Sequence, residues 1–204
     1  MTGKVKKEIN AYGIKVLLSP HPAIRRLKRL FTPTSHGNRF WWSSWLLMDY
    51  FKTTGLKKKS RVMEIGCGWG LASIYCAKYH KAVVTATDID RDVIPYAMLH
   101  GEINGVDVNF IRKSFERLRI KDLEGIDIIL GADICFWDEM VKPLKNLISR
   151  AGKAGVKQVL ISDPVRSPFE ELCGYYSEGR GGEVLDWTAS EPREILGQIL
   201  KISL

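Results

Sequence analysis

The chain has 204 residues, of which 45% are apolar and 26% charged, and its net charge is +8. This length and composition favour a single globular domain with a substantial core. None of the four cysteines belongs to a C-x-x-C pair, and none of the four histidines has metal-ligand spacing, so we expect reduced thiols, no bound metal and a cytoplasmic location. The apolar stretch at residues 14–18 is interrupted by Lys15 and is too short for a signal peptide or a membrane span.

The charge excess lies at the N-terminus. Residues 1–39 contain nine Lys or Arg residues against Glu8 alone, whereas the remainder has 22 basic and 22 acidic residues. Apolar residues recur at helical spacing from Ile24 to Phe31 with basic residues between them, which predicts a short basic amphipathic helix. Such a helix can meet nucleic acid, an acidic protein or a membrane surface, or it can pack on the domain with its charges in water. Turn-forming residues at 32–38 end this basic N-terminal arm, residues 1–38.

An aromatic segment, residues 39–51, follows the arm. Ser43 or Ser44 is expected to cap a helix that ends at Gly55. Strands are then predicted at residues 62–65, 82–87, 106–111, 126–130 and 156–162, and helices at residues 71–79, 91–104 and 139–150. Residues 183–188 and 197–203 are expected to form a final pair of strands, one of them antiparallel. This alternation predicts a mostly parallel sheet with helices on both faces.

Polar residues lie where the predicted strands end, and in such sheets ligands bind beyond the carboxyl ends of the strands. These residues are Glu64, Asp88, Ser114, Asp133 and Asp163. After the first of these strands, Gly66, Gly68 and Gly70 allow a sharp turn on which a ligand can contact backbone N–H groups at a helix N-terminus. A carboxylate at Asp88 can accept both hydroxyls of a ribose. The combination predicts a cofactor that contains adenosine.

Two classes of cofactor fit a glycine turn of this kind. A dinucleotide site has the spacing G-x-G-x-x-G, but this turn has G-x-G-x-G and Leu71 at the position of the third glycine. The carboxylate of Glu64 would repel a pyrophosphate, whereas it suits the ammonium group of a methionine moiety. The residues therefore favour S-adenosylmethionine.

From about Phe40 to the C-terminus the sequence resembles the class I, or seven-strand, S-adenosylmethionine-dependent methyltransferases. The resemblance is carried by E-x-G-x-G-x-G at residues 64–70, by Asp88 and by the strand that ends at Asp133. More narrowly, Trp42-Ser43-Ser44-Trp45-Leu46-Leu47 and Asp133-Ile134-Cys135-Phe136 are similar to elements of the protein-lysine-methyltransferase-like family. The resemblance implies a methyltransferase domain over residues 39–204. It also implies an α/β, Rossmann-like, doubly wound sheet of seven strands in the order 3-2-1-4-5-7-6, with strand 7 antiparallel.

The resemblance also implies roles for individual residues. Glu64 would bond the methionine part of S-adenosylmethionine and Asp88 the ribose, while Ser114 would bond the adenine amino group and Phe115 cover its face. Serine at position 114 departs from the commoner aspartate. The implied cofactor-binding set is Trp42, Glu64, Gly66, Cys67, Gly68, Gly70, Asp88, Ile89, Ser114, Phe115 and Asp133, and the implied catalytic set is Asp133, Phe136 and Trp137. No metal is implied, and the product would be S-adenosylhomocysteine.

The acceptor is expected to be an amine, either of a protein lysine or of a small molecule. Asp133 would orient this amine, and Phe136 and Trp137 would form the walls of the acceptor pocket. Enzymes of this fold that methylate adenine N6 or glutamine amides usually carry N/D-P-P-Y/F at the fourth strand end, and this chain does not. A thiol mechanism at Cys135 is less favoured than an inert buried cysteine. Two alternatives stay open: an RNA methyltransferase that uses the basic arm to bind nucleic acid, and a cofactor-binding or partner-binding module without transfer activity.

Overall fold

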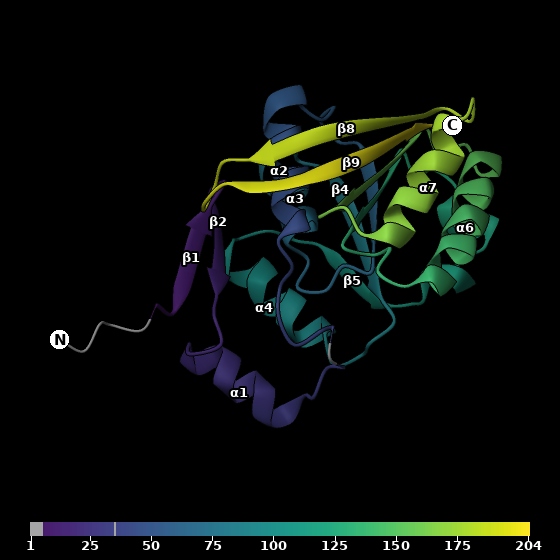
Figure 1. Cartoon of the computed structure of the whole chain (residues 1–204). Coiled ribbons are helices and arrows are strands. Elements are labelled where there is room, and N and C mark those ends of the chain that lie inside the picture. The colour runs from purple at the N-terminus through teal and green to yellow at the C-terminus, as the bar shows by residue number, and fades with distance from the viewer. Residues whose placement is uncertain (1–5, 35) are drawn as a thin grey trace.

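A central sheet organises the computed structural model, which describes residues 6–34 and 36–204. Its seven strands are β3 (Arg61–Ile65), β4 (Val83–Asp88), β5 (Asn109–Arg112), β6 (Ile128–Ala132), β7 (Gln158–Asp163), β8 (Gly182–Ala189) and β9 (Ile195–Ser203). They lie in the order β5-β4-β3-β6-β7-β9-β8 (Figure 1). Strand β9 pairs antiparallel with both β7 and β8, and the remaining pairs are parallel. The predicted fold class is confirmed, including the strand order and the antiparallel strand 7.

Helices cover both faces of this sheet (Figure 1). One face carries α2 (Ser43–Thr54), α3 (Leu71–His80) and α4 (Ile94–Ile103), and the other carries α5 (Ile120–Leu123), α6 (Val141–Lys153) and α7 (Ser167–Ser177). Because side chains alternate along a strand, Val62 joins the buried cluster under α2 and α3, whereas Met63 joins the cluster under α6 and α7. In the part of the chain that the structure describes, no helix is both long and apolar enough to cross a membrane.

Helix α7 is not among the predicted elements, although its sequence carries a helical pattern. Phe169, Leu172, Cys173 and Tyr176 are buried at i, i+3, i+4 and i+7. Pro168 occupies the first turn, where its missing N–H costs no hydrogen bond.

The predicted cap of α2 is wrong. Neither Ser43 nor Ser44 caps this helix, because the N-cap position belongs to Trp42 and no side chain of that residue bonds the first turn. The backbone N–H of Ser43 instead donates to the Asp133 carboxylate at 3.1 Å. Ser162 Oγ donates to the Ser43 carbonyl at 2.8 Å. Two strand ends, those of β6 and β7, therefore fix the start of α2.

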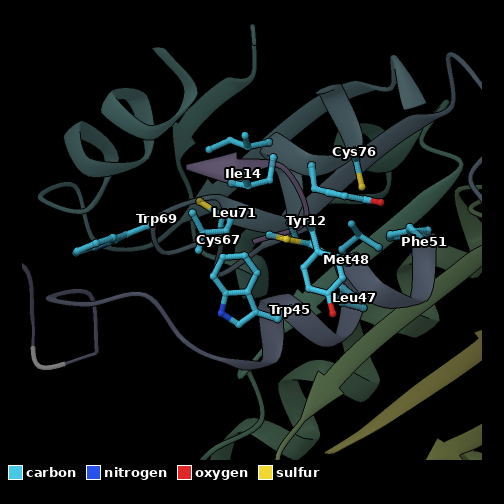
Figure 2. Close-up of a cluster of buried hydrophobic side chains, with 14 of the residues drawn as sticks. Tyr12, Ile14, Trp45, Leu47, Met48, Phe51, Cys67, Trp69, Leu71 and Cys76 are labelled. Carbon is cyan, nitrogen blue, oxygen red and sulfur yellow. The ribbon is translucent and has the colours of Figure 1, made fainter. Parts of the chain in front are cut away.

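The described part of the N-terminal arm is built into the fold. It forms a hairpin of β1 (Glu8–Ala11) and β2 (Ile14–Leu17), which was not predicted, followed by the predicted helix as α1 (Pro22–Leu30). Tyr12 and Gly13 turn the hairpin with φ values of 49° and 68°, as a tight two-residue turn requires. Figure 2 shows Tyr12 and Ile14 beside side chains of α2 and α3, and Ile14 and Ile24 are fully buried. Of the nine basic residues counted in residues 1–39, Lys4 lies outside the described residues. The domain division at residue 38 stays a prediction.

Tyr12 also joins the hairpin to the C-terminal part of the sheet. Its hydroxyl donates to the Asp49 carboxylate at 2.7 Å and accepts the backbone N–H groups of Ser190 at 2.8 Å and Glu191 at 3.0 Å. Its own backbone N–H donates to the Glu191 carboxylate at 2.7 Å. The hairpin turn is thereby bound to α2 and to the connection between β8 and β9.

Candidate functional site

A cavity of about 300 Å³ lies at the carboxyl ends of β3, β4, β5 and β6. Its lining includes the predicted site residues Gly66, Gly68, Asp88, Ile89, Ser114, Phe115, Asp133, Phe136 and Trp137. The other predicted residues, Trp42, Glu64, Cys67 and Gly70, lie outside this lining. A larger cavity of about 710 Å³ lies at the amino ends of β3, β6 and β7, and none of the predicted site residues lines it. The cavity at the carboxyl ends is therefore the candidate site.

The glycine turn between β3 and α3 forms one wall of the cavity. Gly68 has a φ of 52°, and a Cβ placed there would meet no atom within 4 Å, so the turn leaves open space on this side. Gly70 has a φ of 72°, but a Cβ there would lie 2.6 Å from the ring of Phe110. Gly68 thus leaves room for a ligand, whereas Gly70 permits close packing of the turn on β5.

Asp88 closes the turn from the end of β4. One of its carboxylate oxygens accepts the backbone N–H of Gly68 and the other that of Asp90, both at 2.9 Å. Burial raises the pKa of this carboxyl, and these two N–H groups oppose the shift because they stabilise the charged form. Each oxygen retains a lone pair, so the carboxylate can still accept the two hydroxyls of a ribose. The position of this carboxylate and its remaining acceptor sites fit the ribose of the predicted cofactor.

Glu64 is buried beneath the glycine turn, where it links β3 to α3. Its side chain is only 1% exposed, and its carboxylate accepts the backbone N–H of Ser73 in α3 at 3.0 Å. Burial raises its pKa to about 7. A direct bond from Glu64 to the methionine part of a cofactor therefore stays a prediction, because the structure shows this carboxylate bonded to the helix. Cys67 is also buried, which raises the pKa of its thiol.

Ser114 and Phe115 lie at the far end of the cavity, after β5. The Ser114 hydroxyl accepts the backbone N–H of Glu116 at 3.3 Å and caps a short 3₁₀ turn that begins at Phe115. Next to them, Lys113 forms an ion pair of 2.9 Å with Asp122. Ser114 and Phe115, the two residues expected to contact the adenine, therefore both line the cavity, and the 3₁₀ turn fixes their backbone.

Asp133 lies at the end of β6 and at the other end of the cavity. Its φ of 56° places it in the left-handed region, which is uncommon for a residue with a side chain. One carboxylate oxygen pairs with Arg166 at 2.7 Å, and the other accepts the Ser43 N–H. Arg166 also pairs with the fully buried Asp163 at 2.6 Å, and burial raises the pKa of Asp163 to about 6. Asp133 is thus held by two partners before any acceptor arrives.

Aromatic rings wall this end of the cavity. Phe136 and the half-exposed Trp137 line the cavity here, together with His36 and Trp41. The His36 ring stacks on Phe136 with 4.6 Å between centroids, and the Trp41 indole N–H donates to the His36 carbonyl at 2.7 Å. His36 belongs to the run of turn formers at residues 32–38, in which nothing periodic signals a role in a site. The aromatic segment that begins at residue 39 was the available signal for Trp41.

The environment of Cys135 gives little support to thiol chemistry at this cavity. Cys135 is fully buried, and burial raises the pKa of its thiol to about 12, so almost no thiolate forms at neutral pH. Within residues 6–34 and 36–204, no group of three or more His, Cys, Asp or Glu residues is placed to hold a metal ion.

Comparisons with known proteins point to one class. A family model described as a methyltransferase domain matches residues 62–155. The chain is 33% identical over 110 residues to a ubiquinone biosynthesis O-methyltransferase of Coxiella burnetii, across 52% of this chain and 46% of that protein. It is 26% identical over 148 residues to a ribosomal protein L11 methyltransferase of Thermotoga neapolitana, across 72% of this chain and 52% of that protein. The chain therefore spans about half the length of these curated relatives.

A solved structure shows the same fold. The crystal structure of magnesium protoporphyrin IX methyltransferase from Synechocystis, with bound S-adenosylmethionine, has a TM-score of 0.57 to this chain at 16% identity. The similarity covers 89% of this chain and 84% of that chain.

The strand order, the glycine turn and the match of residues 62–155 to a methyltransferase domain support a class I S-adenosylmethionine-dependent methyltransferase. Within it, the matched methyltransferase domain extends from β3 to α6. The family model is a general one for methyltransferases, so the narrower resemblance to the protein-lysine-methyltransferase-like family stays a prediction.

Proposed function

We propose that the chain transfers a methyl group from S-adenosylmethionine to an amine nitrogen, either of a protein lysine or of a small molecule. The observation that carries this proposal is one cavity that joins Gly68 and Asp88 at one side to Phe136 and Trp137 at the other. Asp88 would hold the ribose, and Ser114 with Phe115 the adenine. The acceptor would then bind at the aromatic end.

The walls of the acceptor end suit an amine. The cofactor supplies an activated sulfonium methyl, so the protein's main task is to hold a nucleophile in line with it. Aromatic faces attract an alkylammonium ion by cation-π contact, and Phe136 and Trp137 supply such faces. Trp137 is 54% exposed, which leaves the aromatic end accessible to a side chain of another protein. We place this activity in the cytoplasm, because all four cysteines are free thiols.

Two measurements test the proposal. Calorimetry with S-adenosylmethionine and with NAD separates the cofactor classes, and tighter binding of NAD would contradict it. Transfer of radiolabelled methyl into a lysate, divided into protein, RNA and small-molecule fractions, identifies the acceptor class. We expect label in protein or in small amines that resists mild base, because methyl esters are hydrolysed under those conditions and N-methyl groups are not.

RNA is the second candidate acceptor, on one observation. Helix α1 buries Ile24 and exposes Arg25, Arg26 and Arg29, which can attract phosphate without sequence preference. Label found in the RNA fraction alone, and lost when the three arginines are replaced by glutamine, would favour this candidate. Binding of S-adenosylmethionine with no label in any fraction would favour the module without transfer activity.

A further inference from the structure

His36 occupies a fixed position in the aromatic wall of the cavity. Its ring stacks on Phe136 at 4.6 Å with 20° between the ring planes and stands edge-on to Trp137 at 6.0 Å. Two indole groups hold the backbone around it. Trp41 Nε1 donates to the His36 carbonyl at 2.7 Å, and Trp69 Nε1 donates to the Gly37 carbonyl at 3.1 Å. The imidazole is therefore presented to the acceptor end by contacts from three separate parts of the chain.

The charged residues of the lining make the following contacts. Asp133 binds Arg166 and Ser43, as described above, and Asp88 binds two backbone N–H groups at the ribose side. Asp90 accepts the Thr34 N–H at 2.7 Å, Lys113 pairs with Asp122, and the backbone N–H of Glu116 donates to the Ser114 hydroxyl. Arg39 lies over the Trp41 ring at 4.3 Å and is not among the lining residues. In the described lining, the imidazole is the one side chain that can accept a proton on nitrogen while it is itself neutral.

An amine acceptor at neutral pH carries a proton, and an ammonium nitrogen has no lone pair with which to attack. We propose that His36 is the base that removes this proton, an inference that rests on the proposed methyltransferase function. The neutral imidazole takes a proton from R–NH₃⁺, and the freed lone pair forms the bond to the methyl carbon. The carbon–sulfur bond breaks, its electron pair stays on sulfur, and the product leaves as R–NH₂⁺–CH₃. The imidazolium then returns its proton to water.

The role assigned to Asp133 changes with this proposal. A carboxylate that already binds a guanidinium and a backbone N–H is suited to holding α2 and β6 at the site. It can still attract the acceptor's positive charge. In this proposal His36, and not Asp133, removes the proton from the acceptor amine.

The test compares wild type with His36→Phe and His36→Ala. The readout is transfer of labelled methyl from S-adenosylmethionine to the acceptor fraction of a lysate between pH 6 and pH 9. His36→Phe keeps an aromatic ring against Phe136 but has no base, so we expect its rate to fall by about 10²-fold or more. Binding of S-adenosylhomocysteine, measured by calorimetry, should stay close to that of wild type. Added imidazole should restore part of the rate of His36→Ala.

The pH profile adds a readout that packing alone would not move. The ratio of the wild-type rate to the His36→Phe rate should shrink as the pH falls, because protonated imidazole cannot accept a second proton. A His36→Phe variant with the wild-type rate and profile would overturn the inference and leave the proposed function standing. Equal losses in both variants, without rescue by imidazole and with weakened S-adenosylhomocysteine binding, would also overturn it. If wild type labels no fraction while it binds the cofactor, the proposed function fails, and this inference fails with it.

Discussion

Replacement of Arg166 by methionine tests the ion network under the acceptor end. In this network, Arg166 bridges two carboxylates at 2.6 and 2.7 Å, and the side chains of Asp163 and Asp133 are 0% and 5% exposed. Removing one partner of a buried ion pair costs about 3–5 kcal/mol, because the remaining charge is left buried without compensation. Arg166 itself is 28% exposed, so we expect a loss near the lower end, about 3 kcal/mol at pH 8. Urea unfolding followed by fluorescence measures it.

The stability lost on replacement of Arg166 should depend on pH. The pKa of Asp163 in the folded protein is about 6, above its ordinary value of 3.8, so the folded state binds more protons between these values. Its contribution to stability therefore falls as the pH rises through this window. Without Arg166 the carboxyl should protonate at a still higher pH, because the nearest cation is gone. The variant should therefore lose less stability at pH 5 than at pH 8.

An exposed ion pair provides the matched control. Lys157 pairs with Asp127 at 2.8 Å, but its side chain is 75% exposed. Replacement of Lys157 by methionine should cost less than about 1 kcal/mol, because exposed pairs contribute little. Equal losses for the two variants, or a loss at Arg166 that does not change between pH 5 and pH 8, would refute the reasoning.

Three further variants test the division of labour in the site. Asp88→Ala should weaken S-adenosylhomocysteine binding by roughly 10- to 100-fold, because hydrogen bonds to a charged group contribute about 1.5–3 kcal/mol; calorimetry measures this, with the exposed Asp107→Ala as control. Phe136→Ala should slow methyl transfer while it leaves that binding nearly unchanged, and equal effects on both would contradict the separation of cofactor and acceptor ends. Gly70→Ala should destabilise the fold by about 1–3 kcal/mol, because its Cβ would meet the Phe110 ring at 2.6 Å and its φ of 72° is strained for alanine. Thermal unfolding checks this variant, and an unchanged midpoint would show that the turn can relax.

The central sheet could be predicted because its signals are local. Short apolar strands alternate with helical segments from Arg61 onward, and the glycine turn and Asp88 lie directly at strand ends. Nothing local, by contrast, shows which backbone N–H the carboxylate of Glu64 meets. That partner, Ser73, is set by how α3 packs on β3.

The N-terminal contribution to the cavity could not be predicted in the same way. Thr34 and His36 lie in a run of turn formers without a period, and long-range bonds set their place. The Thr34 N–H donates to Asp90 and the Trp69 indole donates to Gly37, which pins the segment across the ends of β3 and β4. The hairpin before it was missed for another reason. Its strands have four residues each, too few to distinguish a strand from an irregular apolar stretch.

Tyr12 has a consequence for the order in which the molecule is assembled. Its hydroxyl binds backbone N–H groups up to 179 positions further along the chain. A ribosome delivers the hairpin long before those groups exist, so β1 and β2 must wait for the connection between β8 and β9 before they can dock fully. The same arm carries Thr34 and His36 to the cavity. Full docking of the hairpin is therefore coupled to synthesis of the β8–β9 connection, and a nascent chain that already has its glycine turn still lacks this anchor of its N-terminal arm.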